Sequence, residues 1–106
     1  MRFYEHLYVG EKAKSRRFEI LQSLRKGKSS EYYVMTLPEG SKNVLDLYPA
    51  AMIMQPYYMQ RDPVIIGIAL DFRDAAGLAA SVVSELYQNT GGFELESYLN
   101  SKKIRE

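Results

Sequence analysis

The sequence contains no cysteine and only one histidine, His6. Without cysteine the chain cannot form disulfides, thiolate nucleophiles or thiolate metal sites. A single imidazole cannot build the usual zinc sites either. The lack of cysteine also agrees with a reducing compartment.

Long apolar segments are absent as well. No apolar run approaches the roughly 18 residues that a membrane span requires. Residues 1–6 lack the apolar core of a signal peptide. We therefore expect a cytoplasmic protein that is neither secreted nor inserted in a membrane.

The residue combinations that familiar enzymes need are equally scarce. No nucleophile is placed with a base, no carboxylate pair stands out, and no acidic residues are spaced around His6 as metal ligands. A lone histidine is usually a surface or core-edge residue. We predict a non-enzymatic protein with no catalytic residue, no metal site and no cofactor.

The 106 residues include 46% hydrophobic and 25% charged side chains, close to the averages of globular proteins. This length supports one core, and we predict a single domain over residues 1–106. The net charge of +1 is unevenly spread. Residues 1–30 hold eight Lys and Arg against three acids, and residues 31–106 hold six against ten. Such an asymmetry can steer an acidic partner or attract a second copy of the chain.

The spacing of apolar residues predicts a helix over residues 11–26. These residues recur at three- and four-residue steps, and Phe18 lies beside the stripe. We expect Phe18 to be buried with Ile20 and Leu24. Gly27 supplies the stop signal.

Two further helices are predicted in the second half of the chain. Residues 43–55 resume a helical period, which Pro49 is expected to kink or divide. Residues 72–89 form an apolar stripe that begins after Asp71, a good capping residue. In the tail, the pattern over residues 93–100 fits a strand or a helical turn, and we favour a short helix.

Residues 31–37 and 64–70 are predicted to be strands, the second one apolar throughout and therefore covered on both faces. A strand-helix-strand unit of this length normally forms a parallel crossover. The predicted fold class is α/β, a small two-layer or three-layer domain built on this βαβ unit. Because two strands are marginal, a third must come from residues 3–9 or from a second chain, which motivates a homodimer.

Three segments together carry a resemblance. These are Phe3 to Val9, the strand Tyr33 to Leu37, and Ile66 to Ala69 before a long helix. The pattern resembles a family of small bacterial proteins with no assigned activity. The resemblance implies a bacterial cytoplasmic protein and transfers no site residues.

One candidate site follows from the predicted parallel sheet. Ligands of such sheets bind beyond the carboxyl ends of the strands, which would gather Ser41, Asn43, Asp71 and Asp74 at one rim, with Glu39 and Arg73 beside them. The turn that contains Ser41 also precedes a predicted helix, where backbone amides can hold an anion. The alternative is that all four residues serve only as turn and helix-start residues.

A second candidate is the basic segment 11–28, which could bind nucleic acid. Its cations are Lys12, Lys14, Arg16, Arg17, Arg25, Lys26 and Lys28. The alternative to nucleic-acid binding is an ordinary solvent-exposed helix face, which is also rich in Lys and Arg. If Phe18 is buried, no aromatic ring among these cations can stack on a base.

A third candidate is the segment 52–59, which holds three of the five methionines and two of the nine tyrosines. Its candidate interface residues are Met52, Met54, Tyr57, Tyr58 and Met59. Met and Tyr favour interfaces, although core filling explains them too. We predict a cytosolic protein that acts through contact, as a homodimer or a module for another protein. Small-ligand, anion and nucleic-acid binding remain alternatives.

Overall fold

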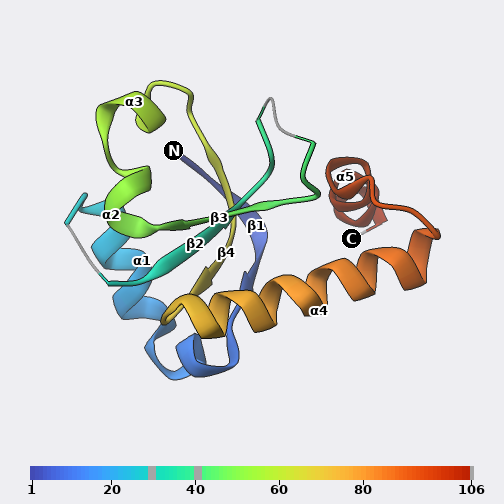
Figure 1. The fold of residues 1–106 in the computed structure, drawn as a ribbon, viewed down its shortest axis with the longest axis horizontal. Coiled ribbons are helices and arrows are strands. Elements are labelled where there is room, and N and C mark those ends of the chain that lie inside the picture. Colours follow the sequence, from blue (N-terminus) through green and yellow to red (C-terminus); the bar gives the residue numbers. More distant parts are fainter. Residues whose placement is uncertain (29–30, 40–41, 106) are drawn as a thin grey trace.

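Four strands form one mixed sheet in the computed structural model, which describes residues 1–28, 31–39 and 42–105. In chain order they are β1 (Arg2–Val9), β2 (Tyr33–Thr36), β3 (Asp46–Pro49) and β4 (Val64–Ala69). Their order across the sheet is β1-β4-β2-β3 (Figure 1). β4 runs parallel to β1, whereas β2 is antiparallel to both of its neighbours.

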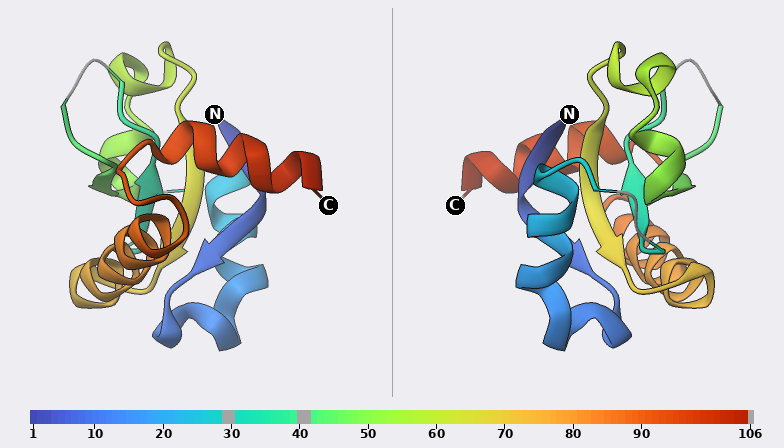
Figure 2. Two further views of the ribbon diagram at one scale, coloured as in Figure 1. Left: turned by 90° about the vertical axis from the view of Figure 1, so that its right-hand side faces the viewer. Right: turned by 90° about the vertical axis from the view of Figure 1, so that its left-hand side faces the viewer.

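Helices cover both faces of the sheet (Figure 2). They are η1 (Glu11–Arg16), α1 (Arg17–Arg25), α2 (Ala50–Ile53), α3 (Pro56–Met59), α4 (Phe72–Thr90) and α5 (Leu95–Arg105). The core on one face is built with η1, α1 and α2, and the core on the other with α4 and α5. The predicted α/β class is therefore confirmed, in its three-layer form. Within the described part of the chain, no helix combines the length and apolar character needed to cross a membrane.

The inner strand β4 holds the two cores together. Its last five residues are buried, which confirms the prediction of a strand covered on both faces. Neighbouring residues Ile65 and Ile66 belong to opposite cores, because successive side chains of a strand point to opposite faces.

The predicted parallel pairing of strands 31–37 and 64–70 is wrong. β2 and β4 are antiparallel, with Val34 opposite Ile68. The prediction assumed that one helix joins the two strands directly. Instead, β3 follows β2 as an antiparallel neighbour and reverses the chain. It is therefore β3 and β4 that share a direction, with β2 between them.

The predicted helix over residues 43–55 is wrong in its first half, where the strand β3 takes its place. All four residues of β3 pair with β2, and only α2 has helical geometry in this segment. Pro49 ends the strand, and Ala50 then donates its N–H to the Tyr32 carbonyl at 2.8 Å. The apolar spacing fits a helix, but the partner that satisfies this backbone lies on β2, outside the local pattern.

The predicted helix over residues 11–26 is divided into the 3-10 helix η1 and the α-helix α1. Ile20 and Leu24 are buried as expected, whereas Phe18 is 73% exposed. Phe18 precedes Ile20 by two residues, which places it about 200° around the helix from that core residue. The prediction that Phe18 is buried is therefore wrong.

The long helix α4 confirms the predicted helix over residues 72–89. The carboxylate of Asp71 caps it by accepting the Asp74 N–H at 2.8 Å. Gly91, at a φ of 72°, ends it in the left-handed conformation that glycine adopts without strain. The predicted short helix of the tail is present as α5.

Residues 2–9 supply the extra strand that the two predicted strands required. β1 pairs with β4 at both ends, with Arg2 opposite Val64 and Val9 opposite Ile68. The register is irregular between Phe3 and Tyr8. Because the chain completes this sheet itself, a missing strand no longer argues for a second copy.

Candidate functional site

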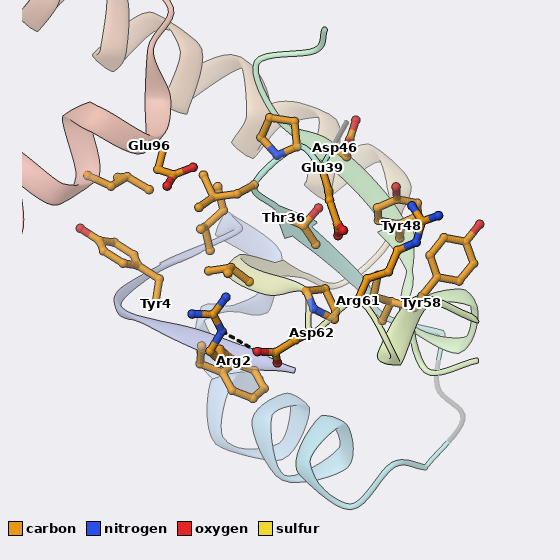
Figure 3. Close-up of a pocket in the computed structure, with 18 of the residues that line it drawn as sticks. Arg2, Tyr4, Thr36, Glu39, Asp46, Tyr48, Tyr58, Arg61, Asp62 and Glu96 are labelled. Atoms are coloured by element: carbon orange, nitrogen blue, oxygen red, sulfur yellow. Dashed lines mark ion pairs between the residues drawn. The ribbon is translucent and has the colours of Figure 1, made fainter. Parts of the chain in front are cut away.

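A cleft of about 570 Å³ lies at the end of the sheet where β2 finishes and β1, β3 and β4 begin (Figure 3). Its walls come from the start of β1, the turn after β2, α3 with the segment leading into β4, and one side of α5. Ligand sites in proteins commonly measure roughly 300–1,000 Å³. The cleft is therefore large enough for a ligand or a segment of a partner.

Acidic side chains outnumber basic ones in the lining. They are Glu5, Glu39, Asp46, Asp62 and Glu96, against Arg2 and Arg61. Asp62 is already matched, because it lies 2.9 Å from the Met1 ammonium and 2.8 Å from Arg2 Nε. The hydrogen bond from the ammonium, with the charge of Arg2, holds the pKa of Asp62 below its usual range. Because Arg2 pairs with Asp62, Arg61 is the one remaining guanidinium of the described lining for the other four carboxylates.

The guanidinium of Arg61 is held by an aromatic ring. It lies 4.6 Å from the centroid of Tyr57 and donates to the Tyr57 hydroxyl at 2.8 Å. Tyr57 does not belong to the lining of the cleft. The Arg61 guanidinium therefore makes a hydrogen bond and a ring contact with a residue outside the cleft.

Two tyrosine rings form one wall of the cleft. The rings of Tyr48 and Tyr58 lie 5.4 Å apart, on β3 and α3 respectively. Burial raises the pKa of Tyr48, and the negative charges of Asp46 and Glu39 raise it further. The wall is thus aromatic and lies in the field of two carboxylates.

Thr36, the last residue of β2, contributes a hydroxyl to the lining. The residue as a whole is only 2% exposed, and its hydroxyl opens into the cleft without a hydrogen bond to another described residue. The pairing with β4 shifts register between Met35 and Thr36, since Met35 faces Gly67 and Thr36 faces Ile65. An irregularity of this kind re-aims side chains at a strand end.

The residues predicted at one ligand rim are not brought together. Asn43 lies beside the cleft and donates its side-chain amide to Asp46 at 2.9 Å, and Ser41 lies outside the described residues. Asp71 and Asp74 follow β4 and therefore lie at the opposite end of the sheet. The predicted rim required β2 and β4 to be parallel, and they are antiparallel.

Asp74 has a structural role at that opposite end. It is only 7% exposed, and its two carboxylate oxygens accept the backbone N–H groups of Lys12 and Leu70, at 3.1 and 3.0 Å. Gly10 passes so close that a Cβ added there would lie 2.2 Å from the Asp74 carboxylate. Asp74 thus joins the ends of β1 and β4 to η1.

The methionine and tyrosine segment lies on α2 and α3, at the cleft end of the sheet. Met52 and Tyr57 are 38% and 59% exposed, whereas Met54, Tyr58 and Met59 are half-buried. Of these five residues, Tyr58 lines the cleft. The segment is therefore partly core and partly surface.

The seven predicted nucleic-acid cations are all exposed. Two of them form surface ion pairs, Lys14 with Glu11 at 2.9 Å and Arg16 with Glu19 at 2.8 Å. The exposed ring of Phe18 stands on the same helical segment. An aromatic platform is thus present where a buried Phe18 would have left none.

A polar cluster that the sequence does not reveal lies between β1, α4 and α5. The hydroxyls of Tyr8 and Tyr98 both donate to Glu85 Oε2 at 2.8 Å. Burial, together with the hydrogen bond to Glu85, raises the pKa of Tyr8. Because its three members come from distant segments, no local pattern points to this cluster.

Among the main cleft residues, Thr36, Asp46 and Arg61 escaped prediction from the sequence, whereas Glu39 was expected at a rim beyond the strand over residues 31–37. Thr36 is a polar residue near the end of the predicted strand over residues 31–37, and threonine is common in strands, so no local signal marks it as a site residue. Glu39 and Asp46 flank a turn, where acidic residues are common, and only the tertiary structure joins them to Tyr58 and Arg61.

The described residues contain no group of three or more His, Asp or Glu side chains arranged to hold a metal ion. In comparisons with protein-family models, curated proteins and solved structures, nothing matches this chain. The resemblance to a bacterial family therefore stays a prediction.

Proposed function

We propose that this protein is a non-enzymatic binding module that holds a basic segment of another protein in its acidic cleft. The observation that carries this proposal is the lining itself, in which five carboxylates accompany two arginines. An excess of negative charge around a concave surface attracts cationic partners and disfavours anionic ones.

The surface beside the cleft suits a protein partner. The exposed side chains of Met52 and Tyr57 extend the apolar area along α2 and α3. Tyr, Met and Arg are enriched at the centres of protein interfaces. A partner that fills the cleft would meet these residues at its edge.

A different protein suits this cleft better than a second copy of the chain. β1 occupies the position for which a partner strand was expected. The chain does carry its own basic segment, so self-association is an outcome that the experiment must separate. Light scattering on the free protein gives this answer, because a second copy in the cleft would raise the mass as concentration increases.

The test is a titration of the ¹⁵N-labelled chain with an arginine-rich and glycine-rich peptide, followed by backbone amide shifts. We expect the shifts to cluster at Glu39, Tyr48 and Glu96, and binding to weaken as salt rises. The control peptide carries Glu in place of each Arg. Equal binding of both peptides, or shifts confined to α4, would contradict the proposal.

A second candidate function, single-stranded nucleic-acid binding, is favoured by the exposed ring of Phe18. A ring among cations can stack with a base, while the cations meet the phosphates. The test is fluorescence anisotropy with a labelled oligonucleotide at two salt concentrations. The Phe18→Ala variant should weaken binding about fivefold or more, the range of one lost stacking contact. Unchanged affinity in this variant would remove the candidate.

A further inference from the structure

The inner part of the cleft brings together four groups that one cation can use at once. In Figure 3 the Glu39 side chain reaches back from the turn after β2, and its carboxylate lies between Thr36 and Arg61. The Tyr48 and Tyr58 rings, which lie 5.4 Å apart, are drawn beside the Arg61 side chain. A carboxylate, a hydroxyl and two rings therefore meet in one space.

Two of these groups have hydrogen-bonding capacity to spare. Thr36 is 2% exposed, and its hydroxyl finds no partner among the described residues. Glu39 forms no ion pair within the described part of the chain. A hydroxyl that opens into a cleft without a partner from the described chain can bind a ligand or water there.

The rings supply the second kind of contact. Arg61 already shows that a guanidinium stacks in this neighbourhood, at 4.6 Å from the Tyr57 ring. The Tyr58 ring contacts the rings of Tyr48 and Tyr57, and the residue lines the cleft. Cations bind aromatic ring faces within about 6 Å of the centroid.

Carboxylates outnumber guanidinium groups around this space. The charges of Asp46 and Glu39 both raise the pKa of Tyr48, whereas that of Arg61 lowers it. Burial contributes most to the raised pKa of Tyr48. The two carboxylates therefore act on the same wall that carries the rings.

We propose that the cleft binds one arginine side chain of the partner, with its guanidinium at the Glu39 carboxylate and the Thr36 hydroxyl, on the side of the cleft that carries Tyr48 and Tyr58. This inference rests on the proposed function, because it names the side chain by which the partner is recognised. Arginine fits better than lysine. Its planar group has five donors in a fixed fork and stacks on rings, whereas an ammonium is a compact, strongly hydrated point charge.

The size of the cleft agrees with a residue inside a peptide chain. At about 570 Å³, the space exceeds one arginine side chain and leaves room for the flanking backbone. Two further carboxylates of the lining, those of Glu5 and Glu96, are available to neighbouring residues of the peptide. We therefore expect a peptide with one arginine to bind better than free arginine.

The test compares three five-residue peptides, Gly-Ser-X-Ser-Gly, in which X is arginine, lysine or citrulline. Citrulline has the shape of arginine without its charge, so it separates charge from packing. We expect the arginine peptide to shift the amides of Thr36, Glu39 and Tyr58 and to bind at least about fivefold more tightly than the lysine peptide. The citrulline peptide should cause no shift.

Variants of Glu39 and Thr36 test where in the cleft the arginine side chain binds. Glu39→Gln should weaken binding of the arginine peptide about tenfold, because one charge-assisted hydrogen bond is lost. The matched control is Glu31→Gln, which changes an exposed carboxylate before β2, at the opposite end of the sheet. Thr36→Val should weaken binding about fivefold and Thr36→Ser should restore it, provided that both variants keep the circular dichroism spectrum of the wild type.

The outcomes separate this inference from the proposed function. If the arginine-rich peptide binds at the cleft but the arginine and citrulline peptides behave alike, the arginine site is wrong and the binding module stands. If no basic peptide binds, both are overturned. A Glu39→Gln variant that binds as tightly as the wild type would also overturn the arginine site.

Discussion

The two ends of the sheet both carry carboxylates, and they differ in what those carboxylates contact. Where β1 and β4 end, Asp74 is buried and accepts two backbone N–H groups. Where β2 ends, Glu39 is exposed at the cleft and has no ion-pair partner in the described residues. The first end uses its polar groups to hold the chain together, and the second leaves them available to another molecule. Stability and binding should therefore respond to mutations at different ends.

The largest effect on stability should come from Gly10→Ala. The added Cβ would lie 2.2 Å from the Asp74 carboxylate, so the carboxylate must move away from the amides that it binds. We expect a loss of about 3 kcal/mol in the free energy of unfolding, measured by urea denaturation. Gly77→Ala is the control, since its Cβ meets no atom within 4 Å. It should stabilise the helix by up to about 1 kcal/mol.

Removal of the Asp74 carboxylate should have the next largest effect. Asp74→Ala leaves the amides of Lys12 and Leu70 buried without an acceptor, and should cost about 2 kcal/mol. Asp71→Ala removes a helix cap from a more exposed position, and should cost about 1 kcal/mol. Equal losses in the two variants, measured by chemical denaturation, would show that Asp74 acts only as part of the helix start.

Mutation of Tyr8, near the end of β1, should have a smaller effect on stability, and that effect should depend on pH. Tyr8→Phe removes one donor to Glu85 and should cost about 1 kcal/mol near neutral pH. The folded state raises the pKa of Tyr8 above its unfolded value, so the folded chain keeps this proton longer. The stabilisation is complete below about pH 10 and is lost as the pH rises further.

Denaturation between pH 8 and pH 11 measures this dependence. The decline should be shallower in Tyr8→Phe than in the wild type. Tyr87→Phe is the control, because Tyr87 is 55% exposed and is held mainly by its stacked ring, which phenylalanine keeps. A control that flattened the curve as strongly as Tyr8→Phe would contradict the assignment to Tyr8.

The smallest effect on stability should come from the cleft. Glu39→Gln removes a charge that has no cationic partner among the described residues, so the free energy of unfolding should change by less than about 0.5 kcal/mol. The same variant should lose most of its affinity for an arginine peptide. Thermal unfolding and peptide titration on one preparation test both statements. A loss of stability as large as that of Asp74→Ala would erase the difference between the two ends.

Most of the individual elements could be predicted from local sequence. Helix α4 was found because its cap at Asp71, its apolar stripe and its terminal glycine all lie in one segment. β4 was found because an inner strand needs apolar side chains on both faces. β3 was missed because the apolar residues of this segment are spaced as in a helix, and the strand that pairs with it, β2, belongs to another segment.

The candidate site was much less predictable. Tyr58 was chosen for the composition around it, and Asp71 and Asp74 were placed at a rim that the antiparallel strands do not form. Thr36 and Glu39 owe their position to the end of β2, and Glu96 owes its position to the packing of α5. None of these placements follows from residues that are neighbours in the chain.

Local interactions were sufficient for the α/β class, for α4 and β4, and for the poverty in catalytic side chains, because each depends on residue type or on contacts within one segment. Strand direction, the exposure of Phe18 and the walls of the cleft were decided by tertiary structure. Each of these depends on which distant backbone satisfies a strand, or on which face of a helix meets the core. Asp74 and Glu39 differ in the same way: Asp74 accepts hydrogen bonds from backbone N–H groups of the chain, whereas the Glu39 carboxylate is exposed at the cleft.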